Sequence, residues 1–178
     1  MVWSLWETNV AKILEDWRIL CVSYKWGHEK KIHFIRTNGD DKALCRALNE
    51  LFNEADVIVA QNGDKFDIKK TNARMIINGL PPPLPYKTID TLKVARKHFG
   101  FLRNDLNSLA EYFGFPGKVE HEGIDLWHGC LANDTKSWKT MERYNKRDVE
   151  LLERVYLKMK PWMKAPVIKT PKLRQFAK

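Results

Sequence analysis

Residues 57–67 have the sequence Val-Ile-Val-Ala-Gln-Asn-Gly-Asp-Lys-Phe-Asp. The first four form a short, continuous apolar run, which is typical of a buried strand covered on both faces. The polar turn that follows predicts a helix from about Lys65 to Asn78, where Gly79 and a proline-rich segment stop it. In open α/β sheets, sites lie beyond the carboxyl ends of strands, so Asp67 is expected to point into a crevice.

The segments on either side extend an α/β pattern. Residues 17–26 are rich in β-branched and aromatic residues, and residues 31–36 alternate polar with apolar, so together they predict an antiparallel hairpin. A break at residues 38–40 offers a helix N-cap, and apolar positions then recur at helical spacing through residues 44–52. Later helices are expected over residues 91–99, 105–113 and about 135–160, with a loop-like region over 119–129. This order of elements indicates a layered α/β or α+β domain.

The length and composition favour one globular domain. The 178 residues are 44% hydrophobic and 30% charged, which fits a folded domain over residues 1–160 followed by a basic, flexible tail over 161–178. No apolar run approaches the roughly 18 residues that a membrane span needs. The N-terminus lacks the pattern of a secretory signal, and the three cysteines are scattered without zinc-ligand spacing. We therefore expect a cytoplasmic protein.

The charge balance favours a polyanionic partner. Lys and Arg total 31 against 22 Asp and Glu, a formal net charge of +9. Basic side chains near phosphates release condensed counterions, so an excess of this size is typical of proteins that bind nucleic acid. Composition alone leaves a merely soluble basic protein as an equal alternative.

The polar turn within residues 61–67 is the first candidate site. Asp67 is of the type that holds a divalent cation, Asn62 is placed to contact the site or a substrate, and Phe66 is expected to anchor the turn. Taken alone, the turn favours a structural alternative. Asp64 is then the helix N-cap, Asp67 interacts with the helix dipole, and Asn-Gly is an ordinary turn pair.

The second candidate site lies within the last predicted helix. Tyr144 and Asp148 are four residues apart, so their side chains share one helix face with Cβ atoms roughly 5–6 Å apart. A carboxylate at that position can bind metal while the phenol orients an attacking water. The alternative is an ordinary helix surface on which Asp148 pairs with Arg147 or another neighbour.

Taken together, the two candidate sites resemble the motifs of the DEDD superfamily of 3′–5′ exonucleases, in its tyrosine (DEDDy) subgroup. Residues 62–67 are similar to that family's second motif, and residues 144–148 are similar to its third. The intervening segments 81–85, 89–92 and 106–109 also fit the family. The resemblance implies a ribonuclease-H-like fold, which is a mixed sheet flanked by helices.

The resemblance also implies a mechanism, namely two-metal hydrolysis of phosphodiester bonds. Two Mg²⁺ or Mn²⁺ ions about 4 Å apart would flank the scissile phosphate. Asp67 and Asp148 would be metal ligands and Tyr144 would position the water; hard oxygen ligands suit these cations. A single-stranded 3′ end is the implied substrate. The residues expected to contact it are Asn62, Lys65, Lys69 and Arg147.

The chain departs from the family at one motif. The family's first motif, an Asp-x-Glu on the first central strand, has no match in this sequence. We therefore expect a sheet that lacks its first strand, with unpaired edges, and a site with only two metal-binding acids. Three hypotheses follow. The chain is a 3′–5′ exonuclease or its C-terminal portion, a catalytically incomplete nucleic-acid-binding module, or an interaction domain completed by a strand from a partner chain or a missing N-terminal segment.

Overall fold

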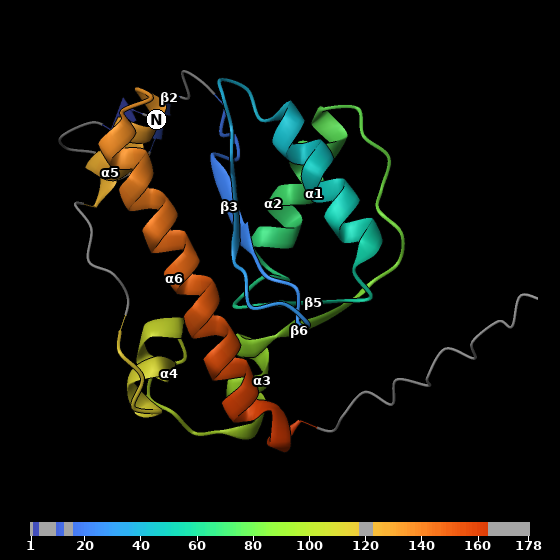
Figure 1. The fold of residues 1–178 in the computed structure, drawn as a ribbon, viewed down its shortest axis with the longest axis vertical. Helices are drawn as coiled ribbons and strands as arrows, with labels where there is room; N and C mark the ends of the chain where they lie inside the picture. The colour runs from blue at the N-terminus through green and yellow to red at the C-terminus, as the bar shows by residue number, and fades with distance from the viewer. Residues whose placement is uncertain (1, 4–9, 13–15, 118–122, 164–178) are drawn as a thin grey trace, which may run out of the picture.

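The computed structural model describes residues 2–3, 10–12, 16–117 and 123–163 (Figure 1). Helices follow and flank short strands, which confirms the α/β class. In chain order the elements are β1 (Val2–Trp3), β2 (Val10–Lys12), β3 (Cys21–Tyr24), β4 (His33–Arg36), α1 (Lys42–Glu54), β5 (Val57–Ala60), α2 (Asp67–Ile77), β6 (Lys87–Asp90), α3 (Thr91–His98), α4 (Leu106–Tyr112), α5 (Ile124–Leu131), α6 (Thr135–Met159) and the 3-10 turn η1 (Lys160–Trp162).

The strands associate in pairs. β1 and β2 are antiparallel, as are β3 and β4, in which Cys21 lies opposite Arg36. β5 and β6 are parallel, and Ala60 lies opposite Asp90. Within the described ranges these are three two-stranded sheets, and no ladder joins β3 to β5. The expectation of a strand buried on both faces is therefore wrong for β5. Its residues are only half-buried, and β6 is its one partner among the described strands.

Helices cover both faces of the β3–β4 hairpin (Figure 1). On one face, Leu44 and Leu48 of α1 and Met75 of α2 form a buried cluster against Val22 and Ile35. On the other face, α5 and α6 contribute a second cluster that packs against Cys21 and Phe34. Neighbouring residues of a strand point to opposite faces, so Cys21 and Val22 belong to different clusters. The hairpin predicted from residues 17–26 and 31–36 is thus confirmed as the centre of a layered domain.

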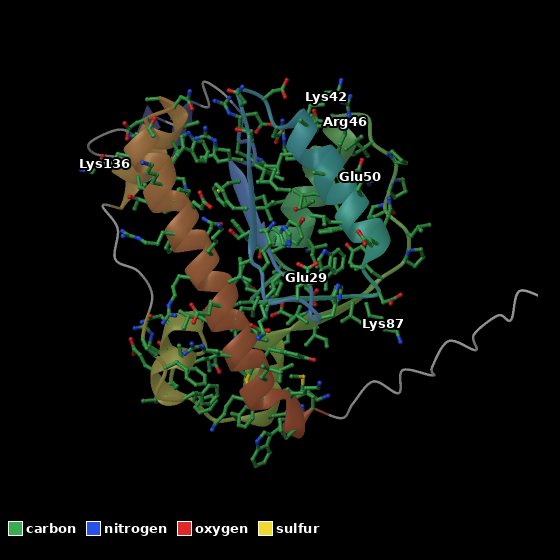
Figure 2. All side chains as sticks on the ribbon, viewed as in Figure 1. Glu29, Lys42, Arg46, Glu50, Lys87 and Lys136 are labelled. Carbon is green, nitrogen blue, oxygen red and sulfur yellow. The ribbon has the colours of Figure 1, made fainter. Side chains whose placement is uncertain are left out.

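The outer surface of α1 confirms the predicted amphipathic helix. Lys42, Arg46 and Glu50 recur every four residues along its exposed face (Figure 2). Leu44 and Leu48 lie on the opposite, buried face. A third apolar cluster joins α3, α4 and α6 below the hairpin, and its buried members are Ala95, Leu106, Leu109, Ala110, Leu151, Val155 and Met159.

A fully buried carboxylate, that of Asp41, ties α1 to α2 and to the segment before β3. It accepts hydrogen bonds from the Arg74 guanidinium at 2.7 and 2.8 Å, from the Ile19 N–H at 2.9 Å and from Asn78 at 3.1 Å. Burial alone would raise the pKa of Asp41, but these donors outweigh it and lower the pKa to about 2. Asp41 is also the N-cap residue of α1, one residue later than expected, and its side chain makes no capping bond.

Several local expectations differ from the structure. Residues 124–131 form α5 instead of a loop, because Leu126 and Cys130 pack against α6. α2 begins at Asp67, and Asp64 is ion-paired to Lys93 at 2.6 Å instead of capping the helix.

The 3-10 turn η1 follows α6 directly. The Trp162 ring of η1 packs on Phe99 with ring centroids 5.6 Å apart. The remainder of the predicted tail, residues 164–178, lies outside the described residues. No helix in the described part of the chain is long and apolar enough to span a membrane.

Candidate functional site

Asp67 is positioned by the turn between β5 and α2. Asn62 has a φ of 59°, in the left-handed region that non-glycine residues seldom adopt. Its carbonyl accepts hydrogen bonds from the N–H groups of Lys65 and Phe66 at 3.3 and 3.0 Å. The chain therefore reverses tightly after the strand, and Asp67 becomes the first residue of α2.

The turn requires a glycine at position 63. Gly63 is buried, and a Cβ added there would meet the Cβ of Ala60 well inside contact distance. The same Cβ would lie 4.0 Å from an Asp67 carboxylate oxygen. Gly63 therefore lets the turn pack closely against the end of β5 and beside the Asp67 carboxylate.

Asp90 ends β6 and holds the neighbouring turn. Its side chain is buried, with 5% of the residue exposed. Its Oδ1 accepts hydrogen bonds from the Leu92 N–H at 3.0 Å, which caps α3, and from the Asn62 N–H at 2.9 Å. Its Oδ2 is buried and has no hydrogen-bond partner among the described residues. The sequence does not single out Asp90 as a site residue, because an aspartate before Thr-Leu has the pattern of a helix N-cap.

The environment of the Asp67 carboxylate disfavours its charged form. The pKa of Asp67 is raised, chiefly because surrounding atoms desolvate its carboxylate and further because the negative charge of Asp90 is close. The residue as a whole is still exposed at the surface. Asp67 is thus solvent-accessible while its carboxylate lies in an environment that disfavours a second uncompensated negative charge.

Tyr144 and Asp148 form the second part of the candidate site, on α6. Loss of solvent, the negative charge of Asp148 and a hydrogen bond to that carboxylate raise the pKa of Tyr144 to about 12. The phenol therefore keeps its proton at neutral pH and donates to Asp148. The half-buried Tyr144 ring also makes an edge contact with Trp127, at a centroid distance of 6.4 Å.

Arg147, which was predicted to contact nucleic acid, is bonded to two groups of the protein. Its guanidinium donates to Glu150 at 2.7 Å and to the Pro116 carbonyl at 2.8 Å. Those bonds tie the segment after α4 to α6. The structural alternative in which Arg147 pairs with Asp148 is therefore wrong, because the Arg147 guanidinium pairs with Glu150.

The basic residues of α2 and its turn divide into two groups. Lys65 and Lys69, which were predicted to contact nucleic acid, are exposed. Lys70 lies over the Trp17 ring at 4.1 Å, and Arg74 is engaged by Asp41. Phe66 does not anchor the turn as expected, because 57% of it is exposed; Asn62 and Asp90 hold the turn instead.

The metal-binding capacity of these side chains is partial. Within the described ranges, no group of three or more His, Cys, Asp or Glu side chains is placed to hold a metal ion. Asp67 and Asp148 supply oxygen ligands of the type that Mg²⁺ and Mn²⁺ prefer. The buried Oδ2 of Asp90, which has no partner in the described ranges, is an oxygen of the same type.

An α/β fold with acids at strand ends and on a late helix defines a ribonuclease-H-like class of protein. The chain belongs to the RNase_H superfamily, whose family pattern matches residues 12–160. Membership supports a nuclease-type function at a coarse level, and with it nucleic-acid binding and the divalent metals that such nucleases generally use. The DEDDy subgroup stays a prediction.

The fold is similar to part of a solved polymerase structure. That structure is the family B DNA polymerase from the hyperthermophilic archaeon Pyrobaculum calidifontis, with a TM-score of 0.61 and 22% sequence identity. The similarity covers 74% of this chain and 20% of the polymerase, so the chain spans about a fifth of that protein's length. At this identity the likeness concerns the fold alone. None of the curated proteins compared with the chain matches it.

Proposed function

We propose that this chain is the exonuclease-type domain of a metal-dependent 3′–5′ exonuclease, which hydrolyses phosphodiester bonds at the end of a DNA or RNA strand. The observation that carries the proposal is the half-buried Tyr144 phenol, which is hydrogen-bonded to the Asp148 carboxylate one helical turn away. Nothing about helix stability requires a half-buried phenol and a carboxylate to share this face. The same arrangement suits a site that orients a water molecule beside a metal-binding acid.

Each side chain then has a distinct role. Asp67 and Asp148 would hold Mg²⁺ or Mn²⁺, which when bound activate water and neutralise charge on the phosphate. Tyr144 keeps its proton and orients the attacking water through its hydroxyl. Lys65 and Lys69 are exposed near Asp67 and contact backbone phosphates, which positions a strand without reading its sequence.

A second candidate function rests on a specific observation. The described residues contain no three-ligand metal group, and the chain carries a net charge of +9. A module that binds a nucleic-acid end without cutting it would show both features. Under the first function, the remaining acids come from a strand that pairs with both β3 and β5, which no ladder joins in the described part of the chain. That strand belongs to a partner or to another part of the same protein.

The test is digestion of a 5′-labelled single-stranded oligonucleotide with Mn²⁺ or with EDTA. Wild-type chain is expected to give a Mn²⁺-dependent ladder that shortens from the 3′ end. Tyr144→Phe removes only the hydroxyl and is expected to lower kcat by about 10²-fold, because the water is no longer held in line. Tyr156→Phe, on the same helix, is the matched control and should leave kcat unchanged. Intact oligonucleotide from folded wild-type protein, together with salt-sensitive binding, would favour the binding module.

A further inference from the structure

We propose that Asp90 is a metal ligand, so that Asp90 and Asp67 together form a divalent-cation site at the carboxyl ends of β5 and β6. The inference deepens the proposed function and rests on it for the class of cation, Mg²⁺ or Mn²⁺. It adds a carboxylate that the family resemblance does not assign to the metal site.

The parallel register brings the two acids to the same edge. Ala60, the last residue of β5, lies opposite Asp90, the last residue of β6. The turn that leads from Ala60 to Asp67 is held to Asp90 by the Asn62 N–H at 2.9 Å. Because Gly63 has no side chain, this turn stays tight against the strand end. Asp67 is therefore fixed beside Asp90 by the backbone itself.

The two oxygens of Asp90 have different surroundings. Oδ1 is saturated by the N–H groups of Asn62 and Leu92, which explains why an aspartate caps α3. Oδ2 contributes nothing to either bond and is buried without a partner in the described part of the chain. An unpaired carboxylate oxygen away from water is unfavourable unless a cation or a donor compensates it. A hard divalent cation, coordinated by oxygen, is such a compensation.

Lys93, a basic side chain close to Asp90, is already engaged. The negative charge of Asp90 reaches Lys93, but the ammonium of Lys93 donates to Asp64 at 2.6 Å, and this bond is the main reason that its pKa is raised. The strand register and the Asn62 N–H bond to Asp90 place the Asp67 and Asp90 carboxylates at the same strand end. A cation between them would relieve both the repulsion and the unpaired oxygen.

The experiment measures Mn²⁺ binding to the full chain without nucleic acid, by the loss of the free Mn²⁺ signal in electron paramagnetic resonance. Asp90→Asn keeps an oxygen for the Asn62 and Leu92 N–H groups but removes the charge and the second carboxylate oxygen. It is expected to weaken Mn²⁺ binding by about tenfold or more, as is Asp67→Asn. Asp105→Asn is the matched control, because Asp105 caps α4 through the Ser108 N–H at 3.0 Å. This control should bind Mn²⁺ as the wild type does.

Undiminished Mn²⁺ binding by Asp90→Asn, with binding lost in Asp67→Asn, would overturn the proposal, and so would a wild-type chain that binds no Mn²⁺. Should Asp90→Asn not fold, the wild-type protein still decides the matter by NMR. Substoichiometric Mn²⁺ is expected to broaden the amide signals of Asn62 and Leu92 before that of Ser108. Broadening confined to residues around Asp148 would contradict the Asp90 site.

The outcome is separable from that of the proposed function. The oligonucleotide assay is run on the same protein samples. Mn²⁺ binding that depends on Asp90 in a chain that cuts nothing supports the cation site and rejects the nuclease. Cleavage by the wild type, with Mn²⁺ binding unchanged in Asp90→Asn, supports the nuclease and rejects the cation site.

Discussion

Asp41 and Asp90 are both buried aspartates that serve as helix N-caps, yet their hydrogen-bonding partners differ. Both oxygens of Asp41 are occupied, by Arg74, Asn78 and the Ile19 N–H. Only Oδ1 of Asp90 is occupied, and the buried Oδ2 has no partner among the described residues. A fully satisfied buried charge is typical of a structural tie, whereas a half-satisfied one at a strand end indicates a place for a ligand.

The two aspartates also lie in different parts of the molecule. The Asp41 network joins α1, α2 and the approach to β3, so it fixes one helical layer against the hairpin. Asp90 joins the ends of β5 and β6 to the turn that carries Asp67. Asp41 therefore has the contacts of a structural carboxylate, whereas Asp90 has those expected under the proposed cation site.

The largest expected effect is that of Asp41→Asn on stability. The substitution leaves the largely buried Arg74 guanidinium with only its longer ion pair to the exposed Asp16, at 3.8 Å, and sets an amide donor among other donors. We expect a loss of about 3–5 kcal/mol in the free energy of unfolding, because breaking a buried pair strands the remaining charge. Urea denaturation at neutral pH measures it.

The control for this variant is Asp64→Asn, which breaks the ion pair between Asp64 and Lys93. The Lys93 side chain in this pair is 57% exposed. The expected cost of the control substitution is about 0–1 kcal/mol, as for other solvent-exposed pairs. Equal losses in the two variants would mean that burial of the Asp41 pair adds nothing.

The second effect is the pH dependence of the same carboxylate. The pKa of Asp41 is lowered from 3.8 to about 2 on folding, so its stabilising contribution is complete above pH 4 and is lost as the pH falls towards 2. The shift corresponds to about 2 kcal/mol. The stability difference between the wild type and Asp41→Asn should shrink by that amount over this range. A difference that stays constant down to pH 2 would show that the charge of Asp41 is not the stabilising feature.

The sequence predicts the elements that have strong periodicity or a long apolar run. The β3–β4 hairpin, α1, β5 and α6 were each expected within a few residues of their observed bounds. β6 was missed because it is four residues long and begins with the exposed Lys87 and Thr88. α5 was missed because its helix depends on Leu126 and Cys130 packing against α6, which no local pattern reveals.

The part of the candidate site that lies within one short sequence motif could be predicted from the sequence. The spacing of Tyr144 and Asp148 is enough to place them on one helix face, and the structure has them in contact. Asp90 was not predictable in the same way, because its relation to Asp67 depends on the register of two strands distant in sequence. Asp90 differs from a simple helix cap in its bond from the Asn62 N–H and in its unpaired Oδ2 among the described residues, and both features depend on the fold.

The smallest expected effect is that of Asp90→Asn on stability, measured in EDTA. Asparagine keeps the oxygen that accepts from the Asn62 and Leu92 N–H groups, and its amide nitrogen replaces an Oδ2 that has no partner among the described residues. Removing a negative charge near Asp67 also relieves repulsion, so we expect a change of less than about 1 kcal/mol in the free energy of unfolding. Added Mn²⁺ should then raise the melting temperature of the wild type but not that of the variant, because only the native wild-type site binds the ion. A loss in EDTA as large as that of Asp41→Asn would mean that Asp90, too, is a structural carboxylate.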